Sequence, residues 1–227
     1  MFSCTVNNPN QFIIKTDNFI PIPFGHRCTS GLACKYANIR KFSLPFDWTI
    51  PLFPSKIKKV LENDFQDFIP DVHNKVFKNI YDFELVHFNT DTDKGIEEYK
   101  RRIHRFQEIM KSTTKIYFIY MNEDYLFDKE YRVDEFNDKI FNEMLDLEVF
   151  LKEKYPHLDF NILYFNFKSH DVPANSNIIN FILHTPNVYD DGANAPYEML
   201  RSYYGYLLSQ LFNTPLTCGY SEETFYY

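Results

Sequence analysis

KIYFIYM, residues 115–121, is an apolar heptapeptide of aromatic and β-branched side chains with one lysine at its start. A run of this length and composition is typical of a strand buried on both faces, as strands in parallel sheets are. Gly95–Lys111 before it and Val133–Tyr155 after it repeat apolar residues at spacings of three and four, and Pro156 follows the second segment. The stretch therefore predicts a helix, a buried strand and a second helix.

The alternation continues towards both ends of the chain. Downstream, the pattern predicts strands at Asp159–Phe167 and Asn177–Thr185 and a helix at Ala195–Phe212. Upstream, it predicts strands at Gln11–Lys15, Phe19–Pro23, Lys75–Ile80 and Asp82–Phe88, and helices at Gly31–Asn38 and Pro54–Phe65. Such alternation favours a single α/β domain over residues 1–227, with a mixed, mostly parallel sheet flanked by helices in Rossmann-like layers.

Composition excludes several classes of function. The net charge of −7 disfavours a general role on nucleic acids or anionic membranes. No apolar run reaches the roughly 18–20 residues that span a bilayer, and no signal peptide is expected at the N-terminus.

The four cysteines lack the spacing of a disulfide framework, which predicts reduced thiols and a cytoplasmic location. With 24 Phe, 17 Tyr and only 6 Gly, the composition is typical of AT-rich coding sequence, such as that of a large DNA virus or an AT-rich microbe.

A possible nucleophile lies between the predicted strand Phe19–Pro23 and the helix that follows it. Cys28 is part of the loop Gly25–Gly31, immediately before the helix start. A thiol at that position faces unpaired backbone N–H groups and the positive end of the helix dipole. We therefore expect the pKa of Cys28 to fall below the free value of about 8.5, as suits a nucleophile.

The loop belongs to a series of blocks that continues well beyond it. In order these are Gly25-His26-Arg27-Cys28, Arg40-Lys41-Phe42-Ser43, Pro45-Phe46-Asp47-Trp48, Leu61–Phe68, Val86-His87-Phe88, Tyr99–Phe106 and Lys115–Tyr120. Together they resemble the papain-like cysteine peptidases, a domain-of-unknown-function family of bacteria and large DNA viruses whose activity is itself inferred. The resemblance covers about residues 19–121. It implies that Cys28 is the nucleophile and that His87 is the base.

The predicted sheet allows that pair to meet without a true papain fold, which combines a helical half with a β-barrel half. Cys28 follows one predicted strand and His87 ends another, and the carboxyl ends of parallel strands share one edge of a sheet. A third group would orient the histidine, with Asp47 and Asp91 as the two possibilities. The alternative interpretation is a small buried cysteine and an unrelated histidine at a strand end.

A second set of residues could bind substrate or an anion. The loop Gly25–Gly31 has the strand–loop–helix setting of a phosphate site, although it lacks the spacing of the nucleotide-binding motifs. Lys100, Arg101, Arg102 and Arg105 form a basic cluster that either makes i,i+4 ion pairs with Glu97 and Glu98 on a helix surface or clamps an anion. The residues assigned to substrate or anion binding are Gly25, His26, Arg40, Ser43, Trp48 and Arg102, with a solvent-exposed loop position as the other possibility for His26.

Neither a metal nor a cofactor is expected. No cysteine–histidine spacing suits zinc. The segment 88–95 departs from a calcium loop in the position of its glycine and in lacking the last glutamate, so we interpret Asp91–Asp93 as the cap of the next helix.

Three functions follow in order of preference. The first is a cysteine-dependent hydrolase that acts on an acyl or amide bond. The second is a sugar or nucleotide-sugar transferase-like protein with its anion at Gly25–Gly31, and the third is a non-catalytic viral interaction protein. The substrate is a peptide, an amide or a phosphorylated small molecule, and the sequence indicates neither which of these it is nor the oligomeric state.

Overall fold

The computed structural model of the chain describes residues 3–7, 14, 16–25, 27–50, 53–70, 79–82, 84–85, 92–122, 134–184 and 194–216. The strands are β1 Ser3–Asn7, β2 Phe19–Pro23, β3 Thr49–Ile50, β4 Glu84–Leu85, β5 Lys115–Met121, β6 Phe160–Asn166 and β7 Ile178–His184. The helices are α1 Thr29–Tyr36, α2 Pro54–Glu62, α3 Asp93–Ile109, α4 Asp134–Lys154 and α5 Asn194–Phe212.

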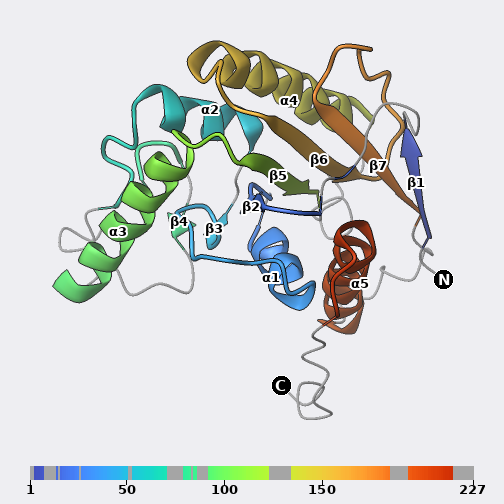
Figure 1. Ribbon diagram of the computed structural model, residues 1–227, viewed down its shortest axis with the longest axis horizontal. Coiled ribbons are helices and arrows are strands. Elements are labelled where there is room, and N and C mark those ends of the chain that lie inside the picture. The colour runs from blue at the N-terminus through green and yellow to red at the C-terminus, as the bar shows by residue number, and fades with distance from the viewer. Residues whose placement is uncertain are drawn as a thin grey trace.

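Five of the strands form one sheet, in the order β1-β7-β6-β5-β2 (Figure 1). Strands β2, β5, β6 and β7 are parallel, and β1 pairs antiparallel with β7 at one edge. The predicted α/β fold with a mixed, mostly parallel sheet is thereby confirmed. A separate two-stranded ribbon joins β3 and β4.

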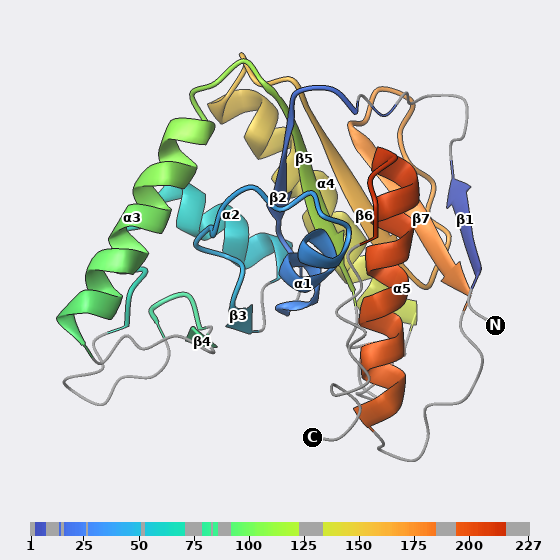
Figure 2. The same ribbon diagram turned by 60° about the horizontal axis from the view of Figure 1, so that its bottom comes forward.

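Helices cover both faces of the five-stranded sheet, as the turned view shows (Figure 2). Helices α1 and α5 lie side by side on one face, and α2, α3 and α4 contribute to the core on the other. Alternate residues of β5 enter the two cores, with Phe118 on the α4 side and Ile119 on the α1 side. The run is apolar from Ile116 to Met121 because both faces of the strand are buried there.

Two prolines mark β2 as the other edge of the sheet. Phe24 N donates to Ile119 O of β5 at 2.8 Å, so the even-numbered residues of this strand direct their N–H groups towards β5. The nitrogens of Pro21 and Pro23 therefore face away from the sheet, where no donor is needed. An edge with two prolines also resists pairing with another chain.

Several element boundaries differ from the prediction. Helix α1 begins two residues early, at Thr29, and α2 ends at Glu62 rather than Phe65 because Asp64 and Phe65 have positive φ angles of 48° and 65°. Strand β1 was not predicted; it pairs with β7, which lies far along the chain.

Of the hairpin predicted over Lys75–Ile80 and Asp82–Phe88, the described residues confirm only part of the second strand. Ile80 lies in a turn, and only Glu84–Leu85 form a strand. Residues 71–78, 83 and 86–91 lie outside the described residues, as does most of the strand predicted at Gln11–Lys15.

Candidate functional site

Cys28 lies at the carboxyl edge of the parallel sheet, where β2 passes into α1. It is the N-cap residue of α1, and its carbonyl accepts the first helical bond, from Leu32 N at 3.0 Å. The side chain is buried, with 4% of its surface exposed. The sequence placed this cysteine at the start of a helix, and the structure agrees.

The loop before Cys28 folds back tightly on the helix. Gly25 N donates to Ser30 Oγ at 2.9 Å inside the protein. A Cβ atom at residue 25 would lie only 2.4 Å from that oxygen. Glycine is therefore required at this position because of the close approach, and Gly25 acts by shaping the loop.

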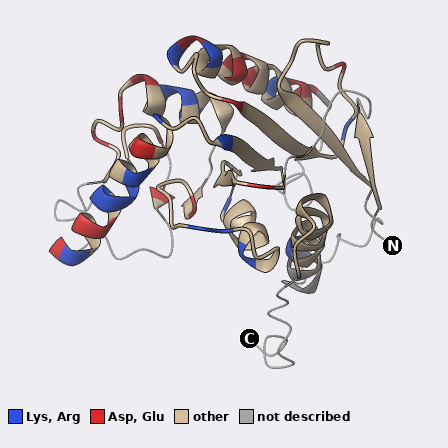
Figure 3. Ribbon diagram, in the orientation of Figure 1, with Lys and Arg blue, Asp and Glu red and all other residues tan. Residues whose placement is uncertain are grey.

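Arg201 of α5 is the residue at this site that the sequence analysis missed. Its Nη2 lies 3.4 Å from Cys28 Sγ, and its Nε donates to Thr29 Oγ1 at 3.1 Å. A guanidinium at that distance stabilises negative charge on sulfur. One sequence signal was available, since Arg201 is the only Lys or Arg in Ala195–Phe212. In Figure 3 the described part of α5 is nearly uncharged, whereas α3 and α4 carry both signs.

Asp47 and Arg40 form a second polar centre, in the loop that follows α1. The Asp47 side chain is fully buried, and its Oδ2 accepts from Arg40 Nη2 and from Leu44 N, the latter at 3.1 Å. The same Arg40 nitrogen donates to Ser43 Oγ at 3.2 Å, and the guanidinium lies over the Trp48 ring. Burial raises the pKa of Asp47, and the neighbouring Arg40 opposes that shift.

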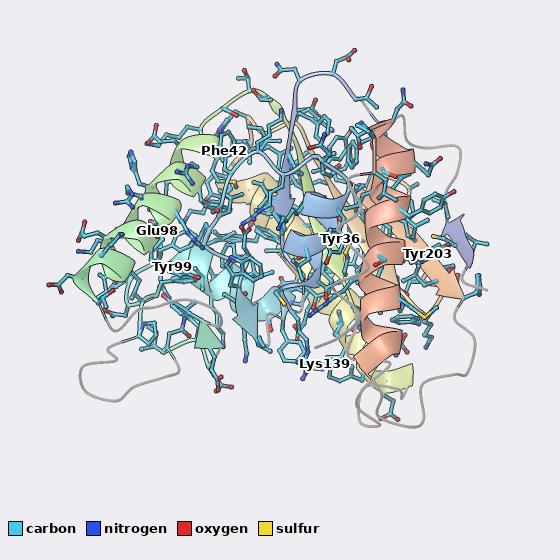
Figure 4. All side chains as sticks on the ribbon, turned by 90° about the horizontal axis from the view of Figure 1, so that it is seen from below. Tyr36, Phe42, Glu98, Tyr99, Lys139 and Tyr203 are labelled. Atoms are coloured by element: carbon cyan, nitrogen blue, oxygen red, sulfur yellow. The ribbon has the colours of Figure 1, made fainter. Side chains whose placement is uncertain are left out.

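Helix α3 holds this loop from the other side. Arg105 Nη1 donates to Ser43 O at 2.7 Å, and Tyr99 OH donates to Pro45 O at 2.9 Å. Figure 4 shows Phe42 and Tyr99 on the α3 side of the molecule, away from α5. Thr92 caps the helix by accepting from Gly95 N, as expected of the segment Asp91–Asp93.

The predicted ion pair between Glu98 and Arg102 is confirmed, but its two members differ, because Glu98 is partly exposed and Arg102 is buried. Arg102 Nη2 donates to Glu98 Oε1 at 2.8 Å, while only 7% of Arg102 is exposed and its guanidinium lies over the Tyr99 ring. The hydrogen bond from Arg102 lowers the pKa of Glu98. Glu97 bonds Lys100, three residues on, rather than the predicted Arg101.

The two centres share helix α1. A Cβ at Gly31 would lie 3.3 Å from Asp47 O, so the helix rests directly on the loop. Cys34, six residues after Cys28, is fully buried, and both its burial and the nearby Asp47 carboxylate raise the pKa of its thiol. The Arg40–Asp47 loop therefore supports the helix that carries Cys28.

The structure unites some of the predicted site residues and leaves others undecided. It brings together Arg40, Ser43, Asp47 and Trp48, and it places Cys28 beside Arg201. His26, His87 and Asp91 lie outside the described residues, so the Cys28–His87 pairing stays a prediction. The second Asp47 oxygen, Oδ1, is buried and has no hydrogen-bond partner in the described part of the chain.

The described residues offer neither a metal centre nor a membrane-spanning helix. Among the described residues, no three or more His, Cys, Asp or Glu side chains gather where they could hold a metal ion. None of the helices within the described ranges has the length and hydropathy needed to cross a membrane.

Comparison with known proteins gives no match, whether with family models, with curated proteins or with solved structures. The functional conclusion therefore depends on the geometry of this chain.

Proposed function

We propose that the chain is a cysteine-dependent hydrolase with Cys28 as its nucleophile. One observation carries the proposal. Cys28 lies at the start of α1, and its sulfur is 3.4 Å from a guanidinium nitrogen of Arg201 in α5. A cation and a helix N-terminus both favour the thiolate, which is the reactive form of cysteine. The site is also at the carboxyl edge of a parallel sheet, where α/β proteins bind their ligands.

The reaction is acyl transfer to sulfur. The thiolate attacks the carbonyl carbon of an amide or ester, a C–S bond forms, and the bond to the leaving amine or alcohol breaks as that group takes a proton. Water then attacks the thioester and releases the acid and the thiolate. His87 is proposed as the group that gives the first proton and takes one from the water, on the strength of the family resemblance.

Asp47 and Arg40 are proposed as positioning residues for this reaction. Their side chains bond to each other and to Leu44 and Ser43, and their loop lies against α1 at Gly31. They would act through the placement of the helix.

Alkylation of the thiols tests the proposal. We expect iodoacetamide to label Cys28 faster than Cys4 at pH 7, followed by peptide mass spectrometry between pH 6 and pH 9. Cys4 is a suitable internal control, because burial raises its pKa to about 11. Faster labelling of Cys4 at neutral pH would falsify the activated thiol. A covalent acyl adduct from a panel of activated esters, lost in Cys28→Ser, would then support hydrolysis itself.

The same atoms support a rival, since Arg201, Thr29 and the N–H groups of α1 could also hold an anion. This transferase-like function predicts thermal stabilisation by nucleoside diphosphates or nucleotide-sugars. A stabilisation kept in Cys28→Ser and lost in Arg201→Met would favour it over the hydrolase. If neither an acyl adduct nor a ligand-induced stabilisation is found, the non-catalytic interaction protein is the function that remains.

A further inference from the structure

A row of polar side chains crosses the sheet on the face covered by α4. The strand register pairs Tyr120 with Tyr164, Tyr164 with Asn180, and Asn180 with Asn7. Tyr120 and Tyr164 belong to the core beneath α4. Residues directly opposite each other project to the same side of a sheet, so all four lie on that face.

The connection between β6 and β7 lies over this row. The ring of His170 in this connection stacks on Phe141 of α4, with centroids 4.3 Å apart and planes 9° apart. Its centroid lies 6.2 Å from that of Tyr164. Asn7 Nδ2 at the end of the row donates to His170 O at 2.7 Å. His170 and Phe141 therefore lie against the polar row, with His170 in contact with Asn7 and beside Tyr164.

Three buried polar atoms in that region lack a hydrogen-bond partner within the described residues. They are Tyr164 OH, His170 Nε2 and Asn180 Nδ2, and Tyr164 and Asn180 have no exposed surface. The other Asn180 atom, Oδ1, accepts from Asn166 Nδ2. Buried polar groups are nearly always hydrogen-bonded, to protein or to ordered water. Asn180 lies opposite Tyr164 in the sheet and the His170 ring neighbours that of Tyr164, so the three residues are candidates for one shared partner.

The surroundings decide the chemistry of that partner. Asp138 of α4 lies 3.6 Å from His170 Nδ1, which favours the proton on that nitrogen and leaves Nε2 as an acceptor. Burial lowers the pKa of His170, so the ring is neutral. Lys168 Nζ donates a hydrogen bond to Asp138 Oδ2 at 2.9 Å. The three atoms thus present one acceptor, one donor and one hydroxyl, without net charge.

We propose that Tyr164, His170 and Asn180 form an internal binding site for a water molecule beneath α4. The water donates to His170 Nε2 and accepts from Asn180 Nδ2 or Tyr164 OH. The site is on the face of the sheet opposite α1, and it is independent of the hydrolase proposal.

Tyr164→Phe tests the site through stability. Removing a hydroxyl that bonds a held water lowers the melting temperature, whereas removing an unpartnered hydroxyl leaves it unchanged or raises it. Tyr204→Phe is the matched control, because Tyr204 is equally buried and its hydroxyl donates to Asn122 O at 3.1 Å. We expect the two variants to lose similar amounts. A Tyr164→Phe protein as stable as the parent would overturn the proposal.

A double-mutant cycle with His170→Phe adds a second test, since phenylalanine retains the stack on Phe141. If one water joins the two side chains, the double variant loses less than the sum of the single losses, because the water is already displaced in each. Additive losses would contradict a shared water. A crystal structure of the parent should also show water density within hydrogen-bond distance of both Tyr164 OH and His170 Nε2, and its absence would equally count against the site.

Discussion

At the scale of single residues, Arg201 is the group that distinguishes Cys28 from the other described cysteines. Cys4 and Cys34 both have pKa values raised by burial, and Cys34 also lies near the carboxylate of Asp47. Cys28 is also buried, but its sulfur has a guanidinium 3.4 Å away. Desolvation and charge stabilisation thus act on the same sulfur in opposite directions.

Arg201→Met should therefore slow the alkylation of Cys28 at pH 7 by about tenfold or more, because a contact with a charged group contributes about 1.5–3 kcal/mol. The rate is measured with limiting iodoacetamide, and the labelling of Cys4 in the same sample serves as the control. Arg201→Lys should retain part of the effect. An unchanged Cys28 rate in a folded Arg201→Met protein would show that the guanidinium does not activate the thiol.

At the scale of elements, α3 combines an exposed face with two arginines of different roles, because Arg105 bonds the loop after α1 and Arg102 is buried against its own helix. Arg102 bonds Glu98 but is itself 7% exposed, so its loss should cost more than an ordinary surface ion pair. We expect Arg102→Ala to lower the free energy of unfolding by about 1–3 kcal/mol. Arg101→Ala, its exposed neighbour on the same helix, should change that free energy by about 0.5 kcal/mol or less.

Urea denaturation at pH 7 measures both variants. Equal, small effects would show that Arg102 behaves as a surface residue, as the i,i+4 pattern alone suggested. If an anionic ligand stabilises the parent and Arg101→Ala but not Arg102→Ala, the result would instead support anion binding by Arg102.

At the scale of the whole molecule, His170 ties the connection between β6 and β7 to α4. Burial lowers its pKa, Asp138 and Asp171 act in the opposite direction, and Lys168 adds to the lowering. Since the folded-state pKa lies below the unfolded value of about 6.5, the neutral ring stabilises the fold above that pH. This stability is lost as the pH falls through the folded-state pKa.

The free energy of unfolding, measured with urea at pH 7.5 and at pH 5, should therefore change by different amounts in the parent and in His170→Phe. We expect the parent to lose more stability than the variant between the two pH values, because phenylalanine does not titrate. Parallel losses in the two proteins would mean that other groups cause the acid sensitivity.

The candidate site was only partly accessible from sequence. The position of Cys28 before a helix was predicted because a strand pattern, a glycine-bearing loop and a helix pattern are local signals. Its contact with Arg201 was not, because the two residues are 173 positions apart and meet only when α1 and α5 pack on the same face of the sheet. The burial of Arg102 was missed for a similar reason, since helical spacing reveals its partner Glu98 but not that the guanidinium is buried in the folded chain.

The sequence by itself determined the alternation of strands and helices, the burial of residues 115–121 and the α/β class, because periodicity records which faces of each element avoid water. Only the tertiary structure decided the pairing of β1 with β7, the division of the helices between the two faces and the polar row beneath α4. These depend on register and packing between segments far apart in the chain. No local pattern encodes them, since each residue in the row follows its own strand's alternation and meets the others only across the sheet.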